Sequence, residues 1–138
     1  MRTALALAPV LVLGLAACGG SAHPAAVVRE WSNSINAGNY ERAASLFAAD
    51  AVVIQGSQAT TFHTPEDAVT WNKGLPCGGD ILLLEERGST ATATFRMVDR
   101  KDRHCDAPAE AEATALFVVD RGKIILWNQI ESHLAMAH

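Results

Sequence analysis

The sequence predicts an α+β domain with three helices and a mainly antiparallel sheet, and three observations carry this prediction. Apolar residues recur at helical spacing between residues 27 and 35. Between residues 90 and 98, threonines alternate with small or apolar residues, as in a strand with one buried face. Short turns at residues 87–89 and 120–123 separate such segments, which is typical of hairpins in an antiparallel sheet.

The first part of the domain is predicted to contain two helices and a strand. The first helix tolerates Pro24 in its first turn and meets a left-handed stop at Gly38. Asn39 can cap the second helix, and the β-branched run at residues 52–54 indicates a strand. The apolar positions are Val27, Val28, Trp31 and Ile35 in the first helix, and Tyr40, Ala43, Ala44 and Phe47 in the second.

A third helix is predicted to begin after Thr64, which can act as its N-cap. Pro65 then takes the first helical position, Asp67 can complete a capping box, and Gly74 followed by Pro76 ends the helix. The segments predicted to be the next four strands are residues 81–86, 90–98, 110–119 and 124–131.

The pattern INAGN followed by LFAADAVV resembles the opening of the nuclear transport factor 2-like (NTF2-like) superfamily, which includes ketosteroid isomerases and SnoaL-like polyketide cyclases. The order of the remaining elements fits the same superfamily, so the resemblance covers roughly residues 24 to 133. It implies a cone in which the three helices pack in the concave face of a strongly curved sheet. The resemblance predicts the fold more directly than the function, because one fold can carry different functions.

Residues 1–17 have one basic residue, an apolar run and small residues before Cys18, which predicts a secretory signal rather than a membrane span. The sequence LAAC at residues 15–18 resembles the lipobox of bacterial lipoproteins, which implies cleavage before Cys18 and its acylation. The alternative is an ordinary signal peptide that contains a cysteine. We expect a lipoprotein signal peptide at 1–17, a lipidated cysteine and short tether at 18–23, and one NTF2-like domain at 24–138.

The charge and length restrict the function classes. The 138 residues carry a formal net charge of −4, and loss of Arg2 with the signal makes the remainder more acidic. Such a surface argues against nucleic acid and against electrostatic attraction to anionic lipid. Attachment to the extracytoplasmic face of the cell membrane would come from acyl chains.

Cys77 and Cys105 are predicted to form a disulfide, because export favours oxidation and the two residues flank the same end of a predicted hairpin. The rival interpretation is a metal site made by both cysteines with His104 and His63. Adjacent histidine and cysteine lack the usual ligand spacing, so neither a metal nor a cofactor is expected. The mixed charges at residues 99–103 are interpreted as a solvated turn.

Ketosteroid isomerases move a proton with a first-strand carboxylate, while a first-helix tyrosine and a protonated fourth-strand aspartic acid stabilise the enolate. The resemblance places Trp31 at the tyrosine position and Gln55 at the position of the base. The fourth-strand acid falls on Thr114 or Ala115. None of these residues can do the original work, so the isomerase mechanism is not expected and no catalytic residue is assigned.

The same correspondence predicts a ligand pocket. Trp127, Gln129 and Glu131 share one face of the last strand and are directed toward Trp31 and Gln55. Two indoles, two amides and one carboxylate suit a largely apolar ligand with a few hydrogen-bonding groups. Alternatively, the tryptophans are plain core, the glutamines bond to backbone and Glu131 lies at the rim in water.

Two functions stay open. The first is a non-catalytic binding module of the cell envelope, for a lipophilic small molecule if the cone holds a large cavity or for an envelope protein if it is filled. The second is a SnoaL-like cyclase, dehydratase or isomerase that uses Glu131 or His133 as acid or base, with His63 as a further candidate. The threonine-rich outer face of the sheet could also support a homodimer.

Overall fold

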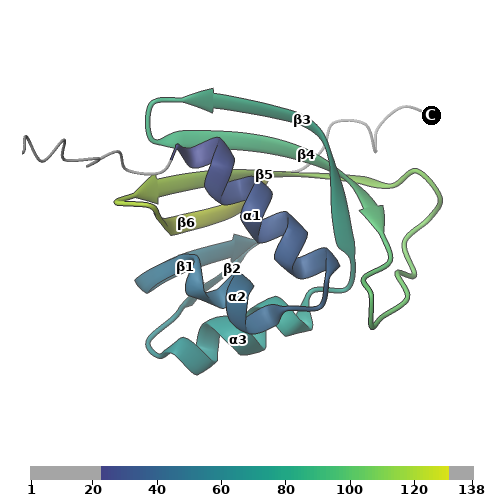
Figure 1. Cartoon of the computed structure of the whole chain (residues 1–138), viewed down its shortest axis with the longest axis horizontal. Coiled ribbons are helices and arrows are strands. Elements are labelled where there is room, and N and C mark those ends of the chain that lie inside the picture. Colours follow the sequence, from purple (N-terminus) through teal and green to yellow (C-terminus); the bar gives the residue numbers. More distant parts are fainter. Residues whose placement is uncertain (1–22, 131–138) are drawn as a thin grey trace, which may run out of the picture.

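The computed structural model describes residues 23–130, and within that range the chain forms three helices and six strands (Figure 1). The elements are α1 (Pro24–Asn36), α2 (Tyr40–Ser45), β1 (Phe47–Gln55), β2 (Gln58–Thr61), α3 (Pro65–Gly74), β3 (Gly78–Arg87), β4 (Thr90–Val98), β5 (Glu112–Asp120) and β6 (Lys123–Ile130). The signal segment, Cys18, Glu131 and His133 lie outside the described residues.

The helix boundaries follow the predicted caps. Gly38 has a φ of 72°, which ends α1 in the left-handed region that favours glycine. The Asn39 side chain accepts a hydrogen bond from the backbone N–H of Arg42 at 3.1 Å and starts α2. Thr64 and Asp67 form the predicted capping box of α3. The placement of Phe47 on the second helix is wrong, because α2 ends at Ser45 and Phe47 begins β1 as a buried residue.

The six strands form one sheet in the order β2-β1-β6-β5-β4-β3. All neighbouring pairs are antiparallel except β1 and β6, which run parallel. β2 was not predicted, since QATT carries no apolar alternation; it pairs with β1 through a turn at Gly56, whose φ is 60°. The mainly antiparallel α+β class is thereby confirmed.

Register shifts in β1, β3 and β5 bend the sheet, and α1 lies across its concave face (Figure 1). The predicted alternation of β4 is confirmed, because Ala91, Ala93 and Phe95 face the interior and are buried. Phe117 on β5 and Ile124 on β6 are fully enclosed. No helix among residues 23–130 is both long and apolar enough to cross a membrane.

The predicted disulfide is present: Cys77, just before β3, is bonded to Cys105, in the connection between β4 and β5. Their Cα atoms lie 4.8 Å apart. Because the two sulfur atoms are bonded to each other, they do not serve as the thiolate ligands of the rival metal-site interpretation.

Residues 99–103 of the β4–β5 connection are exposed except Arg100, so the interpretation of this run as a solvated turn is wrong for Arg100. Its side chain is only 4% exposed and its guanidinium lies over the ring of Tyr40, 5.1 Å from the centroid. Its Nη1 donates to the Lys73 carbonyl at 3.3 Å, near the C-terminus of α3, where a cation is favourable. The Tyr40 hydroxyl donates to Asp102 at 2.7 Å. This hydrogen bond lowers the pKa of Asp102.

Candidate functional site

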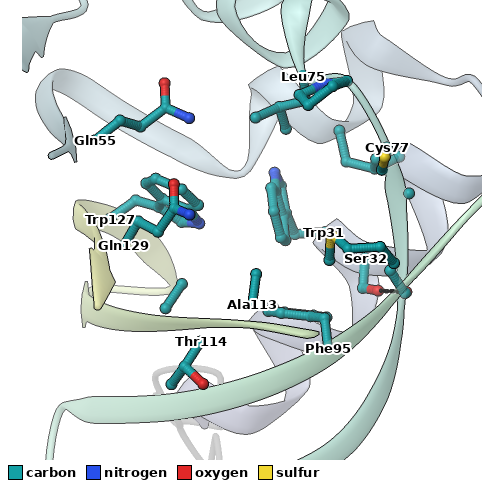
Figure 2. Close-up of a pocket in the computed structure, with 16 residues that line it drawn as sticks. Trp31, Ser32, Gln55, Leu75, Cys77, Phe95, Ala113, Thr114, Trp127 and Gln129 are labelled. Carbon is teal, nitrogen blue, oxygen red and sulfur yellow. Dashed lines mark hydrogen bonds between the residues drawn. The ribbon is translucent and has the colours of Figure 1, made fainter. Parts of the chain in front are cut away.

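A small, mostly apolar cavity of about 110 Å³ opens between α1, the segment that joins α3 to β3, and the concave face of the sheet (Figure 2). Figure 2 shows Gln55 and Gln129 beside Trp127, across the space from Leu75 and Cys77. The lining residues share short or apolar side chains, apart from the glutamines: Trp31, Ser32, Ile35, Gln55, Leu75, Pro76, Cys77, Gly78, Gly79, Phe95, Met97, Ala113, Thr114, Ala115, Trp127 and Gln129.

The two tryptophans of the cavity differ in their hydrogen bonding. Trp31 donates from Nε1 to Oδ1 of Asn72 at 2.8 Å, and Asn72 donates in turn to the Ala68 carbonyl at 2.8 Å. Trp127 is 5% exposed, and its Nε1 has no hydrogen-bond partner among residues 23–130. Among the described residues that line the cavity, Trp127 therefore has the one buried side-chain donor without a partner, which costs about 1 to 3 kcal/mol.

Residues 75–79 form one wall of the cavity, and hydrogen bonds from side chains of α1 hold this wall in place. Ser32 and Asn36 both donate to the Gly79 carbonyl, at 2.8 and 2.9 Å, and Asn36 Oδ1 accepts from the Gly79 N–H at 2.8 Å. A Cβ at Gly78 would come within 2.4 Å of Asn36 Oδ1, so a larger residue would disrupt this attachment. The disulfide at Cys77 fixes the other side of the wall to the β4–β5 connection.

None of the described residues that line the cavity has an ionisable side chain, because Cys77 is in the disulfide. The glutamines are its main uncharged polar groups, and both side chains are exposed at its mouth. A charged ligand would therefore enter without a partner of opposite charge from this part of the chain. The lining favours a neutral molecule.

The structure brings four of the five predicted pocket residues to this cavity, namely Trp31, Gln55, Trp127 and Gln129. Glu131 lies outside the described residues, as does His133. At the position of the isomerase acid, Ala115 is buried against the core, and the Thr114 hydroxyl lies 3.0 Å from that of Thr94.

His63 does not line this cavity. Its imidazole is exposed, with Nδ1 3.7 Å from a carboxylate oxygen of Asp50. His63 belongs instead to a wider groove of about 650 Å³ formed by α2, β1 and the start of α3.

Sequence reasoning missed three groups that shape the site: Asn72, the wall at residues 75–79, and the pair Phe95 and Met97. Phe95 and Met97 could have been found from the sequence, because the alternation of β4 places both on the face of the strand that was predicted to be buried. The sequence of residues 75–79 carried no such signal. Their position is set by hydrogen bonds with residues of α1 that lie more than 40 positions earlier in the chain.

No protein-family model matches the sequence, and no curated protein matches it. Solved structures do match. A candidate ketosteroid isomerase from Kribbella flavida is 18% identical with a TM-score of 0.64, over 80% of this chain and 79% of that one. A candidate polyketide cyclase from Sinorhizobium meliloti is 15% identical with a TM-score of 0.61, over 76% and 94% of the two chains.

An LEH-like epoxide hydrolase from M. tuberculosis is also similar, with 15% identity and a TM-score of 0.59 over 77% of this chain and 80% of that one. The chain has an NTF2-like fold. At these identities the likeness concerns the fold alone, because related frameworks of this kind carry different chemistry.

Proposed function

We propose that this NTF2-like domain is a non-catalytic binding module for a small, largely apolar molecule. The observation that carries the proposal is the cavity itself, which is walled by two indoles, Phe95 and aliphatic groups and has no ionisable side chain among the described lining residues. Acid–base catalysis needs a group that can exchange a proton within hydrogen-bond reach of the substrate. The described lining offers N–H donors and amides instead.

The cavity volume limits the ligand. Sites that enclose a drug-sized molecule span about 300 to 1,000 Å³, whereas an apolar cavity of about 150 Å³ holds benzene. At about 110 Å³, this cavity is smaller than the benzene site, so one ring is the upper limit of what it could enclose, and a larger ligand would extend outward past Gln55 and Gln129.

Native mass spectrometry of the chain released from its host's envelope tests the proposal. We expect a bound molecule of fixed mass that is lost from an Ala113→Leu variant, because leucine at this lining position would fill the space. An Ala49→Leu variant, outside the cavity lining, serves as the matched control. A clean unliganded mass for the wild type would contradict the proposal and favour an envelope protein, or a second copy of the chain, as the partner.

The proposed location is the extracytoplasmic face of the cell membrane, with Cys18 as the acylated residue. The support is the LAAC sequence at residues 15–18. Cys18→Ala should move the protein from the membrane fraction to the soluble fraction and abolish incorporation of labelled palmitate. Labelling that persists in this variant would contradict acylation at Cys18.

A second candidate function is a SnoaL-like cyclase, dehydratase or isomerase. It is favoured by the descriptions of the similar structures as an isomerase, a polyketide cyclase and an epoxide hydrolase. Glu131 or His133, which follow β6 in the sequence, would be the acid or base. Turnover of ketone or epoxide probes that is abolished by Glu131→Gln or His133→Ala would establish this alternative, and turnover that survives both changes would exclude these residues.

A further inference from the structure

We propose that the ligand is a short apolar group joined to a neutral amide, and that the side chains of Gln55 and Gln129 bind this amide at the mouth of the cavity. The assignment rests on the proposed small-molecule function and adds the chemical class of the ligand. It is carried by the neighbouring positions of the two glutamines, by the direction of their side chains and by the uncharged lining.

Gln55 and Gln129 lie beside each other on neighbouring strands. β1 and β6 run parallel with Ile54 opposite Asn128, and the next residue of each strand is a glutamine. Neighbouring strands lie about 4.7 to 4.9 Å apart, and side chains alternate between the two faces of a strand. The glutamines therefore share the face that carries Trp127, and one ligand group can contact both carboxamides.

The polarity of this face changes along the two strands. Val53 and Trp127 are 1% and 5% exposed, whereas the glutamines two residues later are exposed. Figure 2 shows both glutamine side chains extending toward the space in front of Trp31, and no hydrogen bond joins either of them to another residue that lines the cavity. A ligand with its apolar part inside and its polar group at the mouth matches this order.

The amide is inferred from what two carboxamides bind. Each has two N–H donors and a carbonyl acceptor, so the pair can bind both the carbonyl and the N–H of a ligand amide. A ketone would use only the donors of the glutamines. An ionised group would lose hydration without a counter-charge from the described lining.

The apolar part of the ligand is limited by the size of the cavity. The volume of about 110 Å³ is below the roughly 150 Å³ of an apolar cavity that holds benzene. Phe95, Met97 and Ala113 supply apolar contacts inside. An isobutyl group, which has fewer carbon atoms than benzene, is a suitable probe for this space.

The test compares three probes that share an isobutyl group, namely 3-methylbutanamide, 4-methylpentan-2-one and 3-methylbutanoate. They end in an amide, a methyl ketone and a carboxylate of nearly equal size. Each is titrated into the full mature chain by ligand-observed NMR. For the wild type we expect the amide to bind about 3- to 10-fold more tightly than the ketone, the factor for one net hydrogen bond, and the carboxylate to bind more weakly than the amide.

The double variant Gln55→Met with Gln129→Met keeps the length of both side chains and removes both carboxamides. In this variant the amide should bind no more than about twofold more tightly than the ketone. Asn128→Leu is the matched control and should preserve the advantage, because it removes a carboxamide from the opposite face of β6, outside the cavity lining. As an independent readout, nuclear Overhauser contacts should join the isobutyl methyl groups to Phe95 and Met97.

The outcomes separate the two proposals. If the probes contact Phe95 and Met97 but the amide has no advantage that depends on the glutamines, or if the carboxylate binds as tightly as the amide, the amide class is wrong and the binding function stands. If no probe binds the wild type while native mass spectrometry finds a retained molecule, the amide class is again wrong and the binding function stands. If both experiments are negative, both proposals are wrong.

Discussion

The two ends of the space under the curved sheet differ in how completely they are filled. At the closed end, Phe47, Phe62 and Trp71 pack against one another with centroids 5.3 to 5.8 Å apart. At the open end, Trp31 and Trp127 lie 6.4 Å apart and border a cavity. Trp71 and Trp127, with centroids at 4.9 Å, join the two ends.

The difference follows from which elements cover the sheet. At the closed end α2 and α3 pack together, and their side chains meet those of β1. At the open end the cover is α1 and the extended wall at residues 75–79, and the lining includes the short side chains of Ala113 and Ala115. The same sheet thus borders a packed aromatic cluster where α2 and α3 lie beside it and the small apolar cavity where residues 75–79 do.

The largest expected effect lies at the closed end. Phe62→Ala should lower the free energy of unfolding by about 3 to 5 kcal/mol, because Phe62 is 2% exposed and its removal leaves a hole in the aromatic cluster. Denaturant unfolding measures the loss. The matched change at the open end is Met97→Ala, which should cost roughly half as much or less, since Met97 already borders a void. Equal losses would show that the two ends are not energetically different.

Removal of the disulfide is expected to have the next largest effect and to act on the open end. Cys77→Ser with Cys105→Ser should cost roughly 3.5 kcal/mol in the chain-entropy model for a sequence separation of 28. A reducing agent should destabilise the wild type by a similar amount and leave the double variant unchanged. Thiol titration of denatured, oxidised residues 19–138 should find no free thiol, and two reactive thiols would contradict the bridge.

The two cavity tryptophans should respond differently to the same substitution. Trp31→Phe should be less stable than Trp127→Phe by about 1 to 3 kcal/mol, because it leaves the buried Oδ1 of Asn72 without its donor. Trp127→Phe removes an N–H that has no partner in the described part of the chain. Thermal or denaturant unfolding of both variants measures the difference, and a larger loss for Trp127→Phe would contradict the assignment of the unsatisfied donor.

The smallest expected effect is a pH dependence where α2 meets the β4–β5 connection. The hydrogen bond from Tyr40 lowers the pKa of Asp102, so this interaction contributes stability above the unfolded-state pKa and loses it as the pH falls through the folded one. The stability difference between wild type and Tyr40→Phe should therefore shrink below about pH 4. An NMR titration should also show a higher Asp102 pKa in the variant. An unchanged pKa would mean that Tyr40 does not bind the carboxylate in solution.

Much of the fold was predictable because its signals are local. The capping box at Thr64, the left-handed stop at Gly38 and the alternation of β4 each depend on a few neighbouring residues, and all three are present. β2 carried no local signal, because its four residues, three of them polar, become a strand only by pairing with β1.

The candidate site was predictable only in part. Strand alternation and the superfamily resemblance brought out Trp31, Gln55, Trp127 and Gln129, which all line the cavity. The burial of Arg100 was not foreseen, because a cation within a run of mixed charges normally lies in water. It is buried here because Tyr40 and the end of α3, both distant in sequence, provide its contacts.

The parallel pairing of β1 with β6 has a consequence for how the chain reaches its final state. β1 stands between β2 and β6, so the β1–β2 hairpin joins the rest of the sheet only through the last described strand. During synthesis this hairpin can pack against α2 and α3, but β6, the other described strand that pairs with it, is absent until residues 123–130 have been made. Such distant pairing raises the contact order and slows folding. The β1–β2 hairpin therefore joins the sheet only when both the N-terminal half of the domain and β6 are present.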